Sequence, residues 1–156
     1  MSELVLFPPV TADLIRIKVT PEWVDEIRNW CFLHGESRQH SNVLSTYYTE
    51  EQPHQVEWIW EVLQQITARP LFVNSWVQIY QTAGFQPPNN HVGQDITTSG
   101  CLYLTAGSST YFTDPYLQKT NFRTCSVGDV MFWDPQLYHF SPPVLDERIV
   151  LAFNLR

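Results

Sequence analysis

The fold of this chain is constrained most by a change in sequence texture near Leu71. From Leu71 to the C-terminus, short segments rich in aromatic and β-branched residues alternate with Gly, Pro, Asn and Asp, which is typical of β-strands joined by turns. The expected strands are Leu71–Tyr80, Ser99–Thr105, Ser109–Thr113, Asn121–Thr124, Val130–Trp133 and Arg148–Leu155. Regularly spaced short strands of this kind predict a β-sandwich or jelly roll.

The first 70 residues predict one strand and then helices. Ile15, Ile17 and Val19 alternate with Arg16 and Lys18, the period-two pattern of a half-buried strand. Thr20 precedes Pro21 and an acidic first turn, the arrangement of an N-cap with proline at the first helical position, and Gly35 is expected to end this helix. Its apolar positions recur at helical spacing: Trp23, Ile27, Trp30 and Cys31. We interpret the tryptophans of this region as core residues, because aromatic side chains dominate the packing of protein interiors.

A second helix is predicted between Thr49 and Pro70. Thr49 followed by Gln52 resembles a capping box, and Arg69-Pro70 is expected to end the helix. The apolar stripe of this helix consists of Val56, Ile59, Trp60, Leu63 and Ile66.

The composition supports one domain with a core of its own. The 156 residues are 44% hydrophobic and 14% aromatic, enough to bury a sizeable core. We therefore expect a single domain over 1–156, mostly β with N-terminal helices, in which a helical front (1–70) flanks a jelly-roll core (71–156). The formal net charge of −7 argues against general binding to nucleic-acid phosphates, which depends on Lys and Arg.

The sequence also predicts a soluble protein in a reducing compartment. Its three cysteines show no CxxC spacing and suggest neither a disulfide framework nor a thiolate metal site. No apolar run approaches the roughly 20 residues that cross a bilayer, and the N-terminus lacks the basic and apolar regions of a signal peptide. We expect a cytoplasmic location and no membrane partner, while an exposed helix stripe is compatible with an oligomer.

Two histidines and an arginine in the strand-rich part are the candidate site. His91 and His139 are separated in sequence, and Arg148 follows the second histidine on a predicted strand. Two imidazoles suit a non-haem iron ion, and a guanidinium matches a carboxylate in bidentate fashion. The remaining histidines lie in or beside expected helix ends and loops, where a solvated or capping role is the default: His34, His40 and His54.

A series of motifs runs through this part of the chain. In order, they are Trp76, His91, Ser99-Gly100-Cys101-Leu102-Tyr103-Leu104, Asp114-Pro115, Gly128-Asp129-Val130-Met131-Phe132, His139, and Glu147-Arg148 with Phe153-Asn154. The series resembles the small 2-oxoglutarate and Fe(II)-dependent oxygenases of bacteriophage and marine bacterial origin. That family has a double-stranded β-helix, a cupin-like jelly roll. The resemblance covers about Asn74 to Asn154, and residues 1–70 match only in general character.

The resemblance implies a site and a reaction. His91 and His139 would hold Fe(II), and Arg148 would bind the far carboxylate of the cosubstrate 2-oxoglutarate, with Tyr103 either a second donor or a core residue. The activity implied is O₂-dependent hydroxylation of a small-molecule, protein or peptide substrate. A phage-encoded relative would work in the host cytoplasm. Val150 departs from the serine often found in relatives at that position.

Gly93 is the departure that leaves the mechanism open. A carboxylate two residues after the first histidine normally completes the facial triad, and the expected strand would turn positions 91 and 93 to the same face. Water, chloride as in iron halogenases, or Asp95 on a bulged strand are alternative third ligands, with a turn or cap as the other role of Asp95. The remaining alternative is loss of the metal, which would leave a non-catalytic jelly-roll binding or structural protein.

Overall fold

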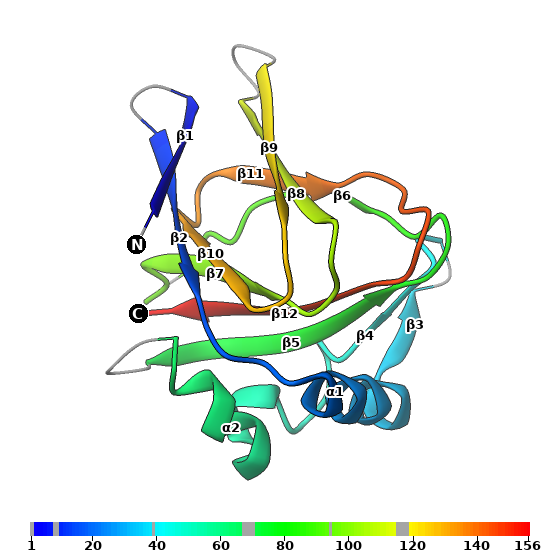
Figure 1. The fold of residues 1–156 in the computed structure, drawn as a ribbon. Coiled ribbons are helices and arrows are strands. Elements are labelled where there is room, and N and C mark those ends of the chain that lie inside the picture. Colours follow the sequence, from blue (N-terminus) through cyan, green and yellow to red (C-terminus); the bar gives the residue numbers. More distant parts are fainter. Residues whose placement is uncertain (1, 8–9, 39, 67–70, 94, 115–118) are drawn as a thin grey trace.

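A computed structural model describes residues 2–7, 10–38, 40–66, 71–93, 95–114 and 119–156. Within them the chain forms two antiparallel sheets that face each other (Figure 1). The large sheet has the order β1 (Ser2–Phe7), β2 (Val10–Arg16), β10 (Asp129–Trp133), β7 (Thr98–Tyr103), β12 (Arg148–Leu155), β5 (Phe72–Tyr80), β4 (Val43–Ser45) and β3 (Glu36–Arg38). The small sheet has the order β6 (Gln86–Asn89), β11 (Tyr138–Ser141), β8 (Ser108–Asp114) and β9 (Lys119–Cys125). The chain is therefore a jelly roll, as predicted.

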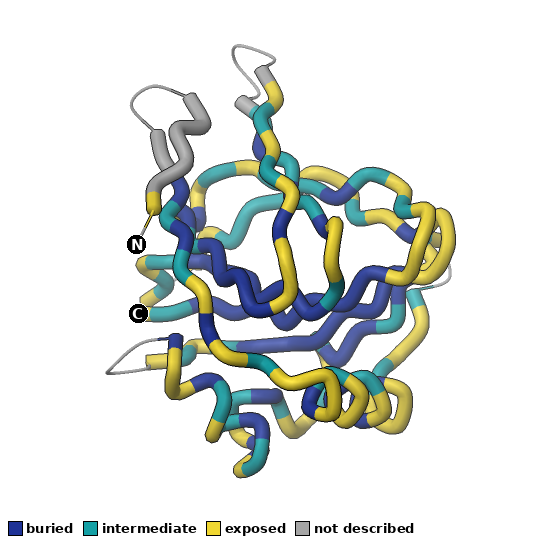
Figure 2. Tube along the Cα trace, in the orientation of Figure 1, coloured by how far each residue is buried: buried dark blue, intermediate teal, exposed yellow. Residues whose placement is uncertain are grey.

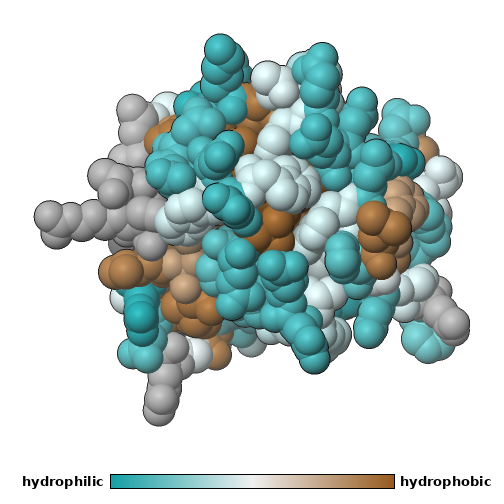
Figure 3. Space-filling view, turned by 90° about the horizontal axis from the view of Figure 1, so that it is seen from below, coloured by the Kyte–Doolittle hydropathy of each residue, from teal (hydrophilic) through white to brown (hydrophobic). Residues whose placement is uncertain are grey.

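Helices cover the outer face of the large sheet (Figure 1). They are α1 (Pro21–His34) and α2 (Glu57–Leu63), the latter preceded by a 3₁₀ turn, η1 (Pro53–Gln55). Their buried side chains pack on alternate residues of β5, β7 and β12 in one hydrophobic cluster. Seen from the helix side, the surface is mostly hydrophilic with separate hydrophobic spots (Figure 3). Neither α-helix of the described residues has the length and hydropathy to cross a bilayer.

Strand alternation divides the large sheet into an apolar face and a face toward the small sheet. In β12, Ile149 and Leu151 belong to the helix-side cluster, whereas Val150 belongs to a second cluster between the sheets. The middle strands are almost continuously buried (Figure 2). Polar side chains on the inter-sheet face, such as Gln78 and Arg148, are therefore enclosed between two layers.

The first predicted helix is confirmed together with its caps. The side-chain oxygen of Thr20 accepts a hydrogen bond from the Trp23 N–H at 3.2 Å, and the Gly35 N–H donates to the Cys31 carbonyl at 2.7 Å. Glycine is required at 35 because an added Cβ would lie 2.6 Å from the Cys31 carbonyl oxygen.

The second predicted helix is shorter than expected. The capping box joins Gln52 and Gln55 of η1, not Thr49 and Gln52, and the Thr49 hydroxyl donates instead to the carbonyls of Thr46 and Glu51, each at 2.8 Å. The α-helix ends at Leu63, and the expected stop at residues 69–70 lies outside the described residues. The Gln52 side chain instead accepts hydrogen bonds from the backbone N–H of Gln55 in η1 and from the Ser75 N–H at 3.0 Å.

All six strands predicted after residue 70 have counterparts. The strand predicted at Ile15–Val19 is confirmed only in its first two residues, because β2 runs from Val10 to Arg16. Residues 2–45 also contribute β1, β3 and β4, which the sequence did not indicate. In the small sheet, β6 and β11 were also not predicted. These additional strands are short or lie toward sheet edges, where hydrophobic alternation is weak.

Gly100 of β7 lies directly opposite Phe153 of β12 and leaves room for its ring. An added Cβ would contact the Phe153 ring, lying 2.5 Å from Cζ, and would lie 2.9 Å from the Met131 carbonyl oxygen. Gly100→Ala is therefore expected to lower the free energy of unfolding by about 3 kcal/mol, because the ring is fixed in a packed core. Urea denaturation measures the loss. Gly107→Ala is the control: Gly107 has φ +73° and nothing within 4 Å of an added Cβ, so only about 1 kcal/mol is expected. Equal losses would contradict the steric explanation.

Candidate metal and cosubstrate site

A pocket between the two sheets brings three predicted residues together. His91, His139 and Arg148 all line it, with neighbours from β5, β7, β8, β10, β11 and β12. His139 lies on β11 of the small sheet, and Arg148 begins β12 of the large sheet. The three residues are far apart in sequence, so only the facing of the two sheets creates this grouping.

The two imidazole rings approach each other through their Nε2 atoms. Nε2 of His91 and Nε2 of His139 are 3.2 Å apart, and the ring centroids are 4.9 Å apart with 15° between the ring planes. Two nitrogens that bind one ion at about 2.1 Å, at right angles, lie about 3.0 Å apart. The pair therefore has the spacing of two neighbouring ligands of one metal ion.

Both histidines are held in the neutral form that binds metals. Nδ1 of His139 lies 3.3 Å from the Leu137 carbonyl oxygen, so Nδ1–H can donate there and leave the Nε2 lone pair free. Burial, and to a lesser degree neighbouring His91, lowers the pKa of His139 to about 3. Burial also lowers the pKa of His91. No proton therefore competes for either ring at neutral pH.

Two tryptophans fix the orientation of these rings. Trp76 of β5 stacks on His91, with centroids 5.4 Å apart and 26° between planes. Trp133 of β10 lies against His139, with centroids 5.0 Å apart. Such contacts restrict ring rotation, which keeps both Nε2 atoms pointed at one position. Trp76, the first element of the predicted motif series, thus lies at the site.

His91 does not lie on a strand, contrary to expectation. The small-sheet strand β6 ends at Asn89, and His91 is held in the following loop by its N–H, which donates to the Pro135 carbonyl at 2.8 Å. The strand alternation used to place Gly93 beside the metal is therefore wrong. Gly93 is exposed, and the nearest neighbour of an added Cβ would be Cδ1 of Ile96 at 3.2 Å. Nothing in this arrangement supports a chloride site at Gly93.

Asp95 is not positioned as a third ligand. It is exposed in a turn with φ +67°, as a turn residue rather than part of a bulged strand. Over the described residues, no group of three His, Cys, Asp or Glu side chains lies close enough to hold one ion. Among the described residues, a third protein ligand beside these two histidines would have to be of another residue type.

Arg148 is buried without an acidic partner. Only 5% of the residue is exposed. Its Nε donates to Ser108 Oγ at 2.5 Å, its Nη2 donates to Thr110 Oγ1 at 3.2 Å, and its Cζ lies 4.7 Å from the centroid of the Tyr80 ring. The ion pairs of the described residues are Arg16–Asp129 and Arg28–Glu147, and neither includes Arg148. Because a buried charge is costly unless neutralised, this guanidinium is suited to an anionic ligand.

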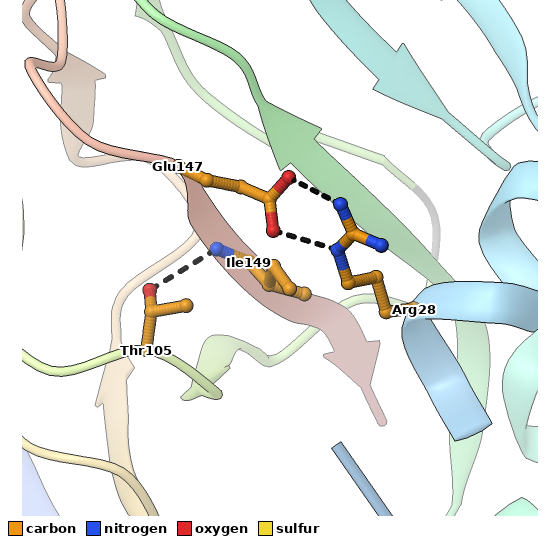
Figure 4. A network of polar contacts seen from close by, with 4 residues as sticks. All are labelled: Arg28, Thr105, Glu147 and Ile149. Atoms are coloured by element: carbon orange, nitrogen blue, oxygen red, sulfur yellow. Dashed lines mark hydrogen bonds and ion pairs between the residues drawn. The ribbon is translucent and has the colours of Figure 1, made fainter. Parts of the chain in front are cut away.

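Glu147 and Ile149, the residues before and after Arg148 in the chain, are both held by hydrogen bonds (Figure 4). Glu147 accepts two hydrogen bonds from Arg28 of α1, at 2.7 and 2.9 Å, and the Ile149 N–H donates to Thr105 Oγ1 at 3.1 Å. Ile149 packs in the helix-side cluster. Because alternate strand residues point to opposite faces, these anchors keep Arg148 directed into the pocket.

No family model and no curated protein matches this sequence. Solved structures match the fold. HygX of Streptomyces hygroscopicus, with nickel and 2-oxoglutarate bound, has a TM-score of 0.67 at 11% identity, covering 95% of this chain and 83% of HygX. A Pseudomonas putida prolyl-4-hydroxylase has a TM-score of 0.63 at 11% identity, covering 96% and 94% of the two chains. The viral collagen prolyl hydroxylase of Paramecium bursaria Chlorella virus-1, a 2-oxoglutarate complex, has a TM-score of 0.62 at 15% identity, with 93% and 94% covered.

The fold is that of 2-oxoglutarate/Fe(II) oxygenases. At identities of 11 to 15%, the likeness to these structures establishes the architecture. The chemistry must be argued from the residues of the pocket themselves.

Tyr103 lies behind the pocket instead of lining it. Its side chain is fully buried, and its hydroxyl is 2.5 Å from Thr110 Oγ1, which in turn accepts from Arg148. Burial raises the pKa of Tyr103 well above its usual value, so the hydroxyl keeps its proton. Tyr103 thus orients Thr110 and Arg148.

The sequence reading missed several polar residues of the pocket. Tyr80 lies directly opposite Arg148 in the β5–β12 ladder, and its hydroxyl donates to Gln78 Oε1 at 2.9 Å. Ser108 and Thr110 alternate on β8 and both accept from Arg148. Pairing the predicted strands would have been needed to find Tyr80. The consecutive polar residues at the start of β8, Ser108-Ser109-Thr110, do not by themselves show which side chains face Arg148.

Proposed function

We propose that this protein is a non-haem Fe(II) and 2-oxoglutarate-dependent oxygenase acting as a hydroxylase. One observation carries the proposal: a buried arginine without an acidic partner shares a pocket with two neutral histidines at ligand spacing. A metal-chelating dicarboxylate satisfies both ends of such a pocket. The fold common to HygX and the prolyl hydroxylases supports the same assignment.

The residues fit the iron and the cosubstrate chemically. Imidazole nitrogens are ordinary ligands of Fe(II), and the two Nε2 atoms are neutral and already converge. Arg148 would pair with the far carboxylate of 2-oxoglutarate, with Ser108 and Thr110 holding the guanidinium in place. Bound iron supplies O₂ activation, with 2-oxoglutarate oxidised to succinate and CO₂. The ring of Tyr80 and the side chain of Val150 exclude water from this end.

The substrate we propose is a small molecule or a peptide. The neighbours include HygX with hygromycin B and a Trichoplax adhaerens prolyl hydroxylase with a peptide fragment. The ordered motifs from Trp76 to Asn154 favour an enzyme of the small bacteriophage and marine bacterial type, acting in the cytoplasm.

Anaerobic addition of Fe(II) and 2-oxoglutarate tests the proposal. A visible metal-to-ligand charge-transfer band is expected, because the keto acid chelates the iron held by His91 and His139. His139→Ala should lose the band. His34→Ala is the matched control, since His34 is exposed at the end of α1, and should keep it. The assignment is wrong if intact protein gives no band, or if His139→Ala retains it.

A further inference from the structure

Asn89 places an amide group beside the two histidines. It is the last residue of β6 and lies directly opposite His139 in the β6–β11 ladder. Its Nδ2 is 3.3 Å from Nε2 of His91. Its Oδ1 is buried and has no hydrogen-bond partner among the described residues. Two imidazole nitrogens, which belong to residues lining the pocket, and the amide of Asn89 therefore lie next to one another.

The buried Oδ1 of Asn89 has no hydrogen-bond donor among the described residues. Leaving a buried carbonyl oxygen unsatisfied costs about 1–3 kcal/mol, so such atoms normally face a donor or a cation. The amide nitrogen of Asn89 is 3.3 Å from His91 Nε2, the atom through which His91 would bind an ion. Binding of an ion there removes this contact, and a half-turn of the amide brings Oδ1 to the position of Nδ2.

That position has the spacing of a neighbouring ligand from His91. The amide is 3.3 Å from His91 Nε2, and His91 Nε2 is 3.2 Å from His139 Nε2. Neighbouring ligands of one ion lie about 3.0 Å apart. Amide oxygens of Asn and Gln are accepted ligands of divalent cations.

We infer that Asn89 Oδ1 is the third protein ligand of the metal ion held by His91 and His139. This inference rests on the proposed function. The ligand would come from two residues before the first histidine, whereas the usual carboxylate comes from two residues after it. Because an amide is neutral, the site would keep one more positive charge than a triad with a carboxylate. Such a site binds the free ion more weakly and an anionic chelator more strongly.

Titration with Co(II) alone tests the inference without activity. Asn89→Ala is expected to raise the Kd for Co(II) by about tenfold and to shift its visible d–d bands, because water replaces the amide. Asn89→Asp is expected to lower the Kd by about tenfold, since a carboxylate adds charge at the same position. Asn90→Ala is the matched control, because the Asn90 amide donates to the Gln136 carbonyl at 3.4 Å instead, and should leave Kd and bands unchanged.

Variants of the two histidines distinguish failure of the Asn89 inference from failure of the proposed function. If His91→Ala and His139→Ala abolish Co(II) binding while both Asn89 variants keep the wild-type Kd and spectrum, the inference fails and the proposed function stands. If intact protein binds no Co(II), or the histidine variants bind it as the wild type does, both fail. Tighter binding by Asn89→Asp distinguishes a ligand from a residue that only orients His91. The aspartate variant is nearly isosteric and keeps the test available if the alanine variant does not fold, as judged by circular dichroism.

Discussion

Arg148→Met should raise the Kd for 2-oxoglutarate by about 100-fold, a loss of about 2.7 kcal/mol. Removing one partner of a buried charge pair typically costs 2–5 kcal/mol, and the carboxylate would find only neutral hydroxyls at this end of the pocket. Methionine fills a similar volume, so the variant is expected to fold, and a buried cation is often replaced by an apolar side chain without loss of stability. Calorimetry in the presence of Mn(II) measures the change.

The control for this prediction is a keto acid that lacks the far carboxylate. 2-Oxobutanoate should bind wild type and Arg148→Met with similar Kd values, because it has no group for the guanidinium. Arg148→Lys should fall between wild type and Arg148→Met, since lysine keeps the charge without the bidentate fork. A Kd for 2-oxoglutarate that stays within threefold of wild type in Arg148→Met would mean that Arg148 is only a core cation.

Binding of Mn(II) at 100 times its Kd is expected to raise the Tm by about 5–10 °C, since the linkage is worth about 2.7 kcal/mol. His139→Ala should abolish the shift because one of the two converging nitrogens is lost. Differential scanning fluorimetry with and without the ion measures it. Comparing each variant with its own metal-free form removes the effect of the substitution on stability itself.

The buried ring of His139 also makes the stability of the metal-free protein depend on pH. The pKa of His139 is lowered to about 3 in the folded state, against about 6.5 in the unfolded chain. Between these values the unfolded state binds the extra proton, so stability is fully present above about pH 6.5 and declines as the pH falls toward 3. His139→Gln should flatten this decline. A wild-type profile that is level between pH 6.5 and 4 would contradict neutral burial of the ring.

The fold could be predicted where side-chain pattern and environment agree. In β12, alternation of apolar residues reports burial on the helix side, and its predicted bounds match the structure. In α1, Thr20 and Pro21 act locally, so their effect could be read without knowing the sheet. By contrast, Gln86–Asn89 contains two prolines and reads as a loop, although an edge strand tolerates the missing N–H groups.

Only part of the candidate site could be predicted from the sequence, because its geometry depends on how the two sheets pack. His91, His139 and Arg148 were found from residue type and order, and the structure brings them into one pocket. Their distances depend on how the small sheet faces the large one, which no local pattern encodes. Asn89 could not be recognised as a candidate ligand from the sequence, because its significance comes from lying across the ladder from His139.

The two prolines of β6 also limit how a substrate can approach. With Pro87 and Pro88 in a four-residue edge strand, half of the residues on this border of the small sheet have no N–H group to offer another strand. An extended peptide therefore cannot dock by continuing the sheet beside Asn89. Any polypeptide that reaches the histidines must cross the pocket mouth and be recognised through its side chains.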